Sequence, residues 1–275
     1  MIFDHPAFAP YRQLIDALDL ARAQPDLARF NAQASATNTT QARGLPLRFV
    51  AAAGRLSARD YETHILQTGE VPTRADTWHD VINALVWLRF PRFKAALNAA
   101  HGEAIGLETD TLRGRRRDAL TVLDESGIWV ISRDPALHAL LAEHAWQTLF
   151  WERRHAVETA MQFVVVGHAL LEKLLAPYPA VTGKCLMLNA DSSDPGSLEP
   201  QAVAAISAID SPRQLAPLPV QGVPGWDAAN AVATYYANQS VFRPPRLNLP
   251  SAANPPRPPT PAPSPDHQTS ESPPT

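Results

Sequence analysis

The side chains best suited to chemistry in this sequence are two histidines, each followed four positions later by a polar residue. These are His79 with Asn83 and His168 with Glu172. Residues i and i+4 share one face of a helix, so each pair sets an imidazole beside an amide or a carboxylate. Such pairs suit general acid–base catalysis. We therefore name His79, His168 and Glu172 as candidate catalytic residues and Asn83 as a candidate ligand-binding residue, although local hydrogen bonding within the structure is the more common role of such groups.

A cluster of arginines at residues 113–118, RGRRRD, is a second candidate. Read as an extended segment, it places Arg115 and Arg117 on one side and Arg116 on the other. Guanidinium groups bind phosphate or carboxylate through paired N–H donors. The sequence thus predicts that Arg115 and Arg117 hold a small anionic ligand, with Asp118 as a further catalytic candidate. A structural ion-pair network or a solvated patch is the alternative.

The remaining candidates are weaker. Asp124 and Glu125 are adjacent carboxylates at an expected turn, where acidic residues usually have a turn-forming role. The single cysteine, Cys185, lies in an expected strand and is interpreted as a buried thiol. A metal held by His168 and Glu172 needs a third ligand, for which Asp118 and His79 are the candidates. No phosphate-binding glycine loop, dinucleotide fingerprint or zinc motif is present, so the metal and the cofactor both stay unassigned.

The element expected to position these groups is the helical stretch at residues 73–101. Apolar residues recur there at helical spacing after a capping Asp76, and the polar row of His79 and Asn83 runs along the same helix. Pro91 is expected to end or kink this helix, and residues 92–100 to form the next one. Because apolar residues cover most of the first helix, we expect it to be buried, with its polar groups facing partners in the interior.

The expected strands and helices around this centre predict an α+β fold. Residues 45–52 and 181–189 are predicted strands, and residues 117–132 are predicted to form a β-hairpin that turns at Glu125-Ser126-Gly127. Residues 31–43 are predicted as loop and residues 69–73 as a turn. Asp134-Pro135 starts a predicted helix, with proline at its first position, and Gly167 precedes another. The fold class is a helix-rich single α+β domain, residues 1–246, with a small, mainly antiparallel sheet.

Composition sets the class and the expected location of the protein. The 275 residues are 45% hydrophobic and carry a net charge of −3, which makes nucleic acid an unexpected partner. One cysteine and no visible secretory signal indicate the cytoplasm, and the apolar runs are too short to cross a membrane. Residues 247–275 are rich in proline and poor in large apolar residues, which predicts a disordered tail through which a protein partner is possible.

Five segments resemble a known family of largely proteobacterial proteins, domain of unknown function 3025. They are TGEVPTRADTWHDVINALVWLRFPRFKAALNAAH (68–101), RRRDALTVLDESG (115–127), GHALLEKLLAPY (167–178), PLPVQGVPGW (217–226) and VFRPPR (241–246). The resemblance implies no activity. Two functions therefore stay open: an enzyme-like binder of a small anionic ligand with His and Glu acid–base or metal chemistry, and a non-catalytic interaction module whose polar motifs are structural networks.

Overall fold

The computed structural model describes residues 2–22, 25–107, 114–191 and 194–244. The chain divides into two units, Met1–Pro244 and Pro245–Thr275, and every described residue belongs to the first. The predicted tail at residues 247–275 lies outside the described residues, so its disorder and the domain boundary at residue 246 both stay predictions.

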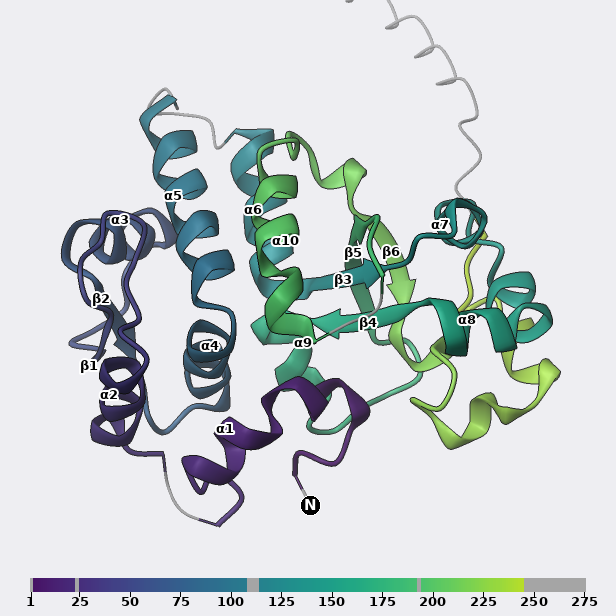
Figure 1. The fold of residues 1–275 in the computed structure, drawn as a ribbon, viewed down its shortest axis with the longest axis horizontal. Coiled ribbons are helices and arrows are strands. Elements are labelled where there is room, and N and C mark those ends of the chain that lie inside the picture. The colour runs from purple at the N-terminus through teal and green to yellow at the C-terminus, as the bar shows by residue number, and fades with distance from the viewer. Residues whose placement is uncertain (1, 23–24, 108–113, 192–193, 245–275) are drawn as a thin grey trace, which may run out of the picture. The chain divides into compact units, whose positions relative to one another are not determined.

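The described chain alternates helices with short strands (Figure 1). The α-helices are α1 (Arg12–Ala17), α2 (Leu27–Ala36), α3 (Ala58–Thr68), α4 (Trp78–Arg89), α5 (Pro91–Leu107), α6 (Arg115–Ser126), α7 (Pro135–Ala142), α8 (Arg154–Ala160), α9 (His168–Lys173) and α10 (Glu199–Ile206). The strands are β1 (Arg48–Ala51), β2 (Glu70–Thr73), β3 (Gly127–Ile131), β4 (Gln162–Val165), β5 (Thr182–Leu188) and β6 (Ala216–Pro219). Shorter helical turns are η1 (Pro6–Tyr11), the π-helical η2 (Thr148–Glu152), η3 (Pro195–Leu198), η4 (Pro212–Gln214), η5 (Val220–Gly222), η6 (Ala228–Ala231) and η7 (Ala233–Ala237).

Two sheets flank a layer of helices in the described chain. The larger sheet has the strand order β4-β3-β5-β6; β3 runs antiparallel to β4 and parallel to β5, and β5 runs antiparallel to β6. The smaller sheet pairs β1 and β2 in parallel. Figure 1 shows α4 and α5 between the two sheets, with α6 and α10 next to the larger one. The prediction of a helix-rich α+β fold is confirmed, and the larger sheet is mixed, with antiparallel pairing at two of its three strand contacts.

Helix α4 is buried, as the sequence pattern predicts, and α5 buries one part of its surface. Every residue of α4 from Val81 to Leu88 is buried, including Asn83. Phe90 separates the two helices, and Pro91 opens α5, where its missing N–H costs no hydrogen bond. The carboxylate of Glu199 on α10 accepts from the free backbone N–H of Phe93 at 2.8 Å, which satisfies a donor that the start of a helix leaves open.

The predicted hairpin at residues 117–132 is wrong. Its first half is helix α6 and only its second half is a strand, β3, whose partners are β4 and β5. The side chains of Ala119, Leu120 and Leu123 are buried together, which is a helical spacing. Thr121 and Val122 favour strands, and Gly127 resembles a turn glycine, but its backbone is extended and leads straight into β3.

Three smaller predictions also need correction. Residues 31–36 continue helix α2 instead of forming a loop, and Glu70–Thr73 is strand β2 instead of a turn. Gly69, which precedes β2, is the left-handed cap of α3, with φ +74°. Thr77 and not Asp76 stands at the N-cap of α4. None of the described helices has the length and apolar character that crossing a bilayer requires.

Candidate functional site

Two of the predicted residues, His79 and His168, are in direct contact. His79 lies in the first turn of α4, and His168 is the first residue of α9, 89 positions later in the chain. Their Nε2 atoms are 3.1 Å apart, and the rings meet edge to face with centroids 4.6 Å apart. The contact joins the two histidine motifs of the sequence into one group.

A glycine between β4 and α9 allows this contact. The N–H groups of Val166 and Gly167 both donate to the carbonyl of Gly127, at 3.0 and 2.9 Å. A Cβ on Gly167 would lie 2.4 Å from the backbone nitrogen of Gly127, which is closer than atoms can approach. The lack of a side chain at Gly167 therefore lets the start of α9 lie against the junction of α6 and β3, and this places His168 beside Asp124.

Each histidine has a second anchor on its other ring nitrogen. His168 Nδ1 lies 2.8 Å from the backbone carbonyl oxygen of Asp124 and 3.7 Å from its carboxylate. His79 Nδ1 lies 2.9 Å from Oε2 of Glu172. The i, i+4 spacing of His168 and Glu172 suggests that these two bond each other within α9, whereas the carboxylate bonds His79 on α4.

The hydrogen bonds that link Glu172, His79 and His168 determine which ring nitrogens carry protons. A carbonyl oxygen only accepts, so Nδ1 of His168 carries a proton. In the neutral ring Nε2 of His168 is then an acceptor, and Nε2 of His79 must donate to it. The remaining contact, between His79 Nδ1 and Glu172, holds one more proton, on the ring or on the carboxylate. Glu172, His79 and His168 therefore share one proton beyond those of two neutral rings and a carboxylate.

Burial keeps His168 neutral. The side chain is 8% exposed, and burial, with help from the charges of Lys94 and His79, lowers its pKa to about 4 against the opposing effect of Asp124. By contrast, the side chains of His79 and Glu172 are 38% and 40% exposed. The chain thus runs from the half-exposed Glu172 to the buried His168.

Asp124 is held by a buried ammonium group. Lys94 on α5 donates to its carboxylate, and the lysine side chain is only 5% exposed. Burial pushes the pKa of Asp124 up, but Lys94 and His168 outweigh that effect and leave the pKa below its ordinary value. Asp124 therefore stays ionised and links the histidines to α5.

A stripe of polar residues on α5 continues the site inward. Lys94, Asn98 and His101 are all buried and follow one another at i, i+4 and i+7. The amide of Asn98 donates to the carboxylate of Glu62 on α3 at 2.7 Å. Burial first, and then the negative charge of Asp124, raises the pKa of Glu62 to about 7, while Lys94, Asn98 and Arg117 oppose the rise.

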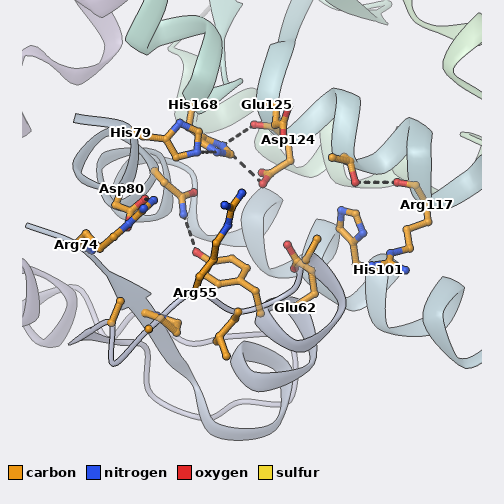
Figure 2. A pocket seen from close by; sticks show the side chains of 18 residues that line it. Arg55, Glu62, Arg74, His79, Asp80, His101, Arg117, Asp124, Glu125 and His168 are labelled. Carbon is orange, nitrogen blue, oxygen red and sulfur yellow. Dashed lines mark hydrogen bonds and ion pairs between the residues drawn. The ribbon is translucent and has the colours of Figure 1, made fainter. Parts of the chain in front are cut away.

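One cavity of about 700 Å³ is lined by His79, His168, Asp124, Glu62 and His101, whereas Lys94 and Asn98 line a much smaller one. Figure 2 shows His79, His168 and Asp124 above the labelled Arg55 and Glu62, with His101 and Arg117 to one side. Arg55 comes from the loop between β1 and α3, and among the described residues it makes no hydrogen bond or ion pair. The hydroxyl of Tyr61 accepts from Asn83 at 2.9 Å. Burial raises the pKa of Tyr61, so this phenol is a neutral donor at the cavity wall.

The structure brings most of the predicted site residues together, but not all of them. His79, Asn83, His168 and Arg117 line the cavity. Glu172 does not line it but contacts His79, which does. Arg115 is exposed on the first turn of α6 and does not line it, because the segment is helical and not extended. Asp118 is also outside the lining.

The predicted grouping of the arginines needs the same correction. Arg116 leaves the cavity and bonds the carbonyl of Ile209 and the carboxylate of Asp210, at 2.9 and 3.2 Å. Asp124 and Glu125, predicted at a turn, lie in the last turn of α6, and both line the cavity.

No three or more His, Cys, Asp or Glu side chains among the described residues form a group that could hold a metal ion. Cys185 is buried, as expected.

Sequence reasoning missed six residues of the site: Arg55, Tyr61, Glu62, Lys94, Asn98 and His101. One signal was available for part of this set. Lys94, Asn98 and His101 share a face of a helix whose other residues are mostly apolar, and a buried polar row of that kind indicates partners in the interior. Arg55, Tyr61 and Glu62 carry no comparable local pattern, since their place in the cavity depends on how α3 packs on α5.

Comparison with known proteins gives a family and no activity. Residues 47–246 match the model of a family described as "Protein of unknown function (DUF3025)". No curated protein and no solved structure matches the chain. The match contains every cavity residue discussed above, from Arg55 to Glu172.

Proposed function

The chain belongs to the DUF3025 family, whose description names no activity, and from its site we propose that the protein is an enzyme that binds a small anionic molecule and moves protons to or from it. The proposed ligand carries a phosphate or carboxylate group. The observation that carries the proposal is the continuous chain Glu172–His79–His168–Asp124 at the wall of a cavity of about 700 Å³.

The linked histidines support acid–base chemistry. A buried neutral imidazole with its Nδ1 proton fixed offers Nε2 as a proton acceptor. His79, next to His168, holds or passes on the shared proton. Glu172 orients the ring of His79 from the solvent side. Groups with this mutual geometry act as general acids and bases when a ligand lies within hydrogen-bond reach. His79 and His168 are the proposed proton-transfer residues, and Glu172 and Asp124 are positioning residues.

The donors around the cavity support an anionic ligand. Arg55 contributes a guanidinium group that no described residue engages, and Tyr61 contributes a neutral hydroxyl positioned by Asn83. The acidic groups nearby are largely offset: Asp124 is paired with Lys94, and Asp80 receives three hydrogen bonds from Arg74 at 2.8 to 2.9 Å. An anion beside Arg55 therefore meets donors, where it would form charge-assisted hydrogen bonds.

Titration of the full chain with inorganic phosphate, sulfate and acetate by calorimetry tests this proposal. We expect saturable binding of at least one of them, and a loss of about tenfold or more in affinity in Arg55→Ala, because a hydrogen bond to a charged group contributes about 1.5–3 kcal/mol. Arg59→Ala is the matched control, since Arg59 lies four residues further along in the first turn of α3, is exposed and does not line the cavity. Absence of saturable binding, or equal affinities for the two variants, would contradict the proposal.

Two finer parts of the proposal rest on the sequence. We propose the cytoplasm as the location, supported by a lone cysteine that is buried as a free thiol.

A protein partner for the proline-rich segment at residues 247–275 is supported by its composition. A pull-down with that segment alone and with the full chain tests the second part: a partner retained by the full chain and not by the segment would contradict it.

A further inference from the structure

Glu62 carries a carboxyl group that belongs neither to the sequence motifs nor to the chain of linked histidines. Glu62 lines the large cavity and also a second, much smaller one of about 10 Å³ behind it. The residue as a whole is partly exposed, but its carboxyl is surrounded by protein on the side of α5. It therefore stands between the open cavity and the buried polar stripe of that helix.

Two cations, Lys94 and Arg117, act on Glu62, but among the described residues neither forms an ion pair with it. The groups that face it are Tyr61 on α3, Lys94, Asn98 and His101 on α5, and Arg117 and Asp124 on α6. The one ammonium group among them, Lys94, is bonded to Asp124. Among the described residues, Glu62 takes part in no ion pair, and its carboxylate has one hydrogen bond, from Asn98.

Glu62 and Asp124 favour different protonation states, because Asp124 is paired directly with the ammonium group of Lys94 and Glu62 has no ion pair among the described residues. Asp124 holds the ammonium and stays ionised. Glu62, which is next to that negative charge, is stabilised by keeping its proton. The pKa of Asp124 lies below its ordinary value and that of Glu62 is raised to about 7, because burial and the charge of Asp124 outweigh the effects of Lys94, Asn98 and Arg117 on Glu62. A carboxyl group that holds and releases a proton near neutral pH is suited to acid–base work.

We propose that Glu62 is a second proton-transfer group of this site, which gives a proton to the bound anionic ligand and takes one back. The inference rests on the proposed function and deepens it. It places one exchangeable proton on α3, in addition to the proton shared by Glu172, His79 and His168. In the step itself the O–H bond of Glu62 breaks, the proton passes to the ligand, and the carboxylate left behind regains a proton from the ligand or from solvent.

The probe is sulfate, which stays fully ionised near pH 7, so any proton taken up on binding goes to the protein. Calorimetry at pH 7 in buffers of different ionisation enthalpy gives the number of protons bound with the anion. We expect the native protein to take up protons, since an anion beside Glu62 favours its neutral form. Glu62→Gln is expected to bind sulfate and to lose most of this uptake, because the glutamine can still accept from Asn98 but cannot titrate.

Two variants make the result specific. Glu125→Gln removes an exposed carboxylate that lines the same cavity and is expected to leave the uptake unchanged. Glu62→Asp keeps a titrating carboxyl and is expected to keep part of the uptake, and it replaces the glutamine variant if that one does not fold. Sulfate binding with unchanged uptake in Glu62→Gln would overturn the inference alone. No binding of sulfate, phosphate or acetate by the native protein would overturn the proposed function and this inference with it.

Discussion

The two sides of the cavity differ in how many partners hold their titratable groups. On one side, His79 and His168 from α4 and α9 have a partner on every ring nitrogen. On the other side, Glu62 from α3 has one hydrogen bond and no ion pair among the described residues. Burial favours the neutral form on both sides, and this lowers the pKa of His168 and raises that of Glu62.

The difference lies in what holds each neutral group in place. Hydrogen bonds fix His168 in one tautomer and one orientation, so its Nε2 is a proton acceptor in a fixed position. The protonation of Glu62 depends on its burial and on neighbouring charges, chiefly the pair of Lys94 with Asp124, so we expect it to change when that pair or a ligand changes. The pair is thus the link between the two sides, because Asp124 bonds His168 and its charge also acts on Glu62.

Removal of the linking ammonium is expected to have the largest effect. Lys94→Met leaves the ionised Asp124 buried without its cation, at a cost of roughly 3–5 kcal/mol in the free energy of unfolding. Denaturant titration at pH 7 measures it. Arg74→Met is the comparison, because Arg74 is 56% exposed and its ion pair with Asp80 should contribute about 1 kcal/mol or less. Equal costs for the two variants would mean that the Lys94–Asp124 pair is solvated.

The pH dependence of stability separates the two sides, because their signs are opposite. Glu62 has a raised pKa, so from about pH 4.5 to 7 the unfolded chain loses this proton first, and stability falls as pH rises. His168 has a lowered pKa, so from about pH 6.5 down to 4 the unfolded chain gains this proton first, and stability falls as pH falls. In the native protein the two trends offset each other.

Single variants should uncover each trend. Between pH 4.5 and 6.5 we expect Glu62→Gln to become more stable as pH rises and His168→Gln to become less stable, each by roughly 2–3 kcal/mol. Urea titrations at several pH values give both slopes. Two variants with the same slope would show that burial does not displace these two pKa values in opposite directions.

A smaller effect is expected at the glycine that brings the two histidines together. Gly167→Ala forces the backbone of α9 away from Gly127, at a cost of roughly 1–3 kcal/mol. Gly106→Ala is the control: Gly106 is exposed in α5, a Cβ there meets nothing within 4 Å, and alanine should stabilise the helix by up to about 1 kcal/mol. Thermal melts in which Gly167→Ala is more stable than Gly106→Ala would contradict the close approach of Gly167 to Gly127.

Local patterns predicted the elements better than the site. The helices α4, α5 and α9 and the strand β5 follow from apolar spacing and from Pro91 and Gly167, which are properties of short segments. The hairpin at residues 117–132 failed because β-branched residues and Gly127 resemble strand and turn signals, whereas packing on α5 and α9 selects a helix.

The site depends on contacts between distant segments. Patterns within single helices singled out His79 and His168, which both line the cavity, but no local signal pairs Glu172 with His79, 93 positions away. The same holds for Glu62, whose environment comes from α5 and α6. Arg115 was misplaced because alternation in a strand and rotation in a helix put the same residues on different sides.

The central claim, that a linked acid–base chain lies at this cavity, is tested most directly by the protons of His168. Long-range proton–nitrogen NMR spectra of the native protein with labelled histidine, assigned with His168→Gln, report the protonation of both ring nitrogens. We predict that His168 stays neutral between pH 8 and 5, with its proton on Nδ1, in line with its pKa of about 4. A His168 ring that protonates near its ordinary pKa of 6.5, or that carries its proton on Nε2, would contradict the account.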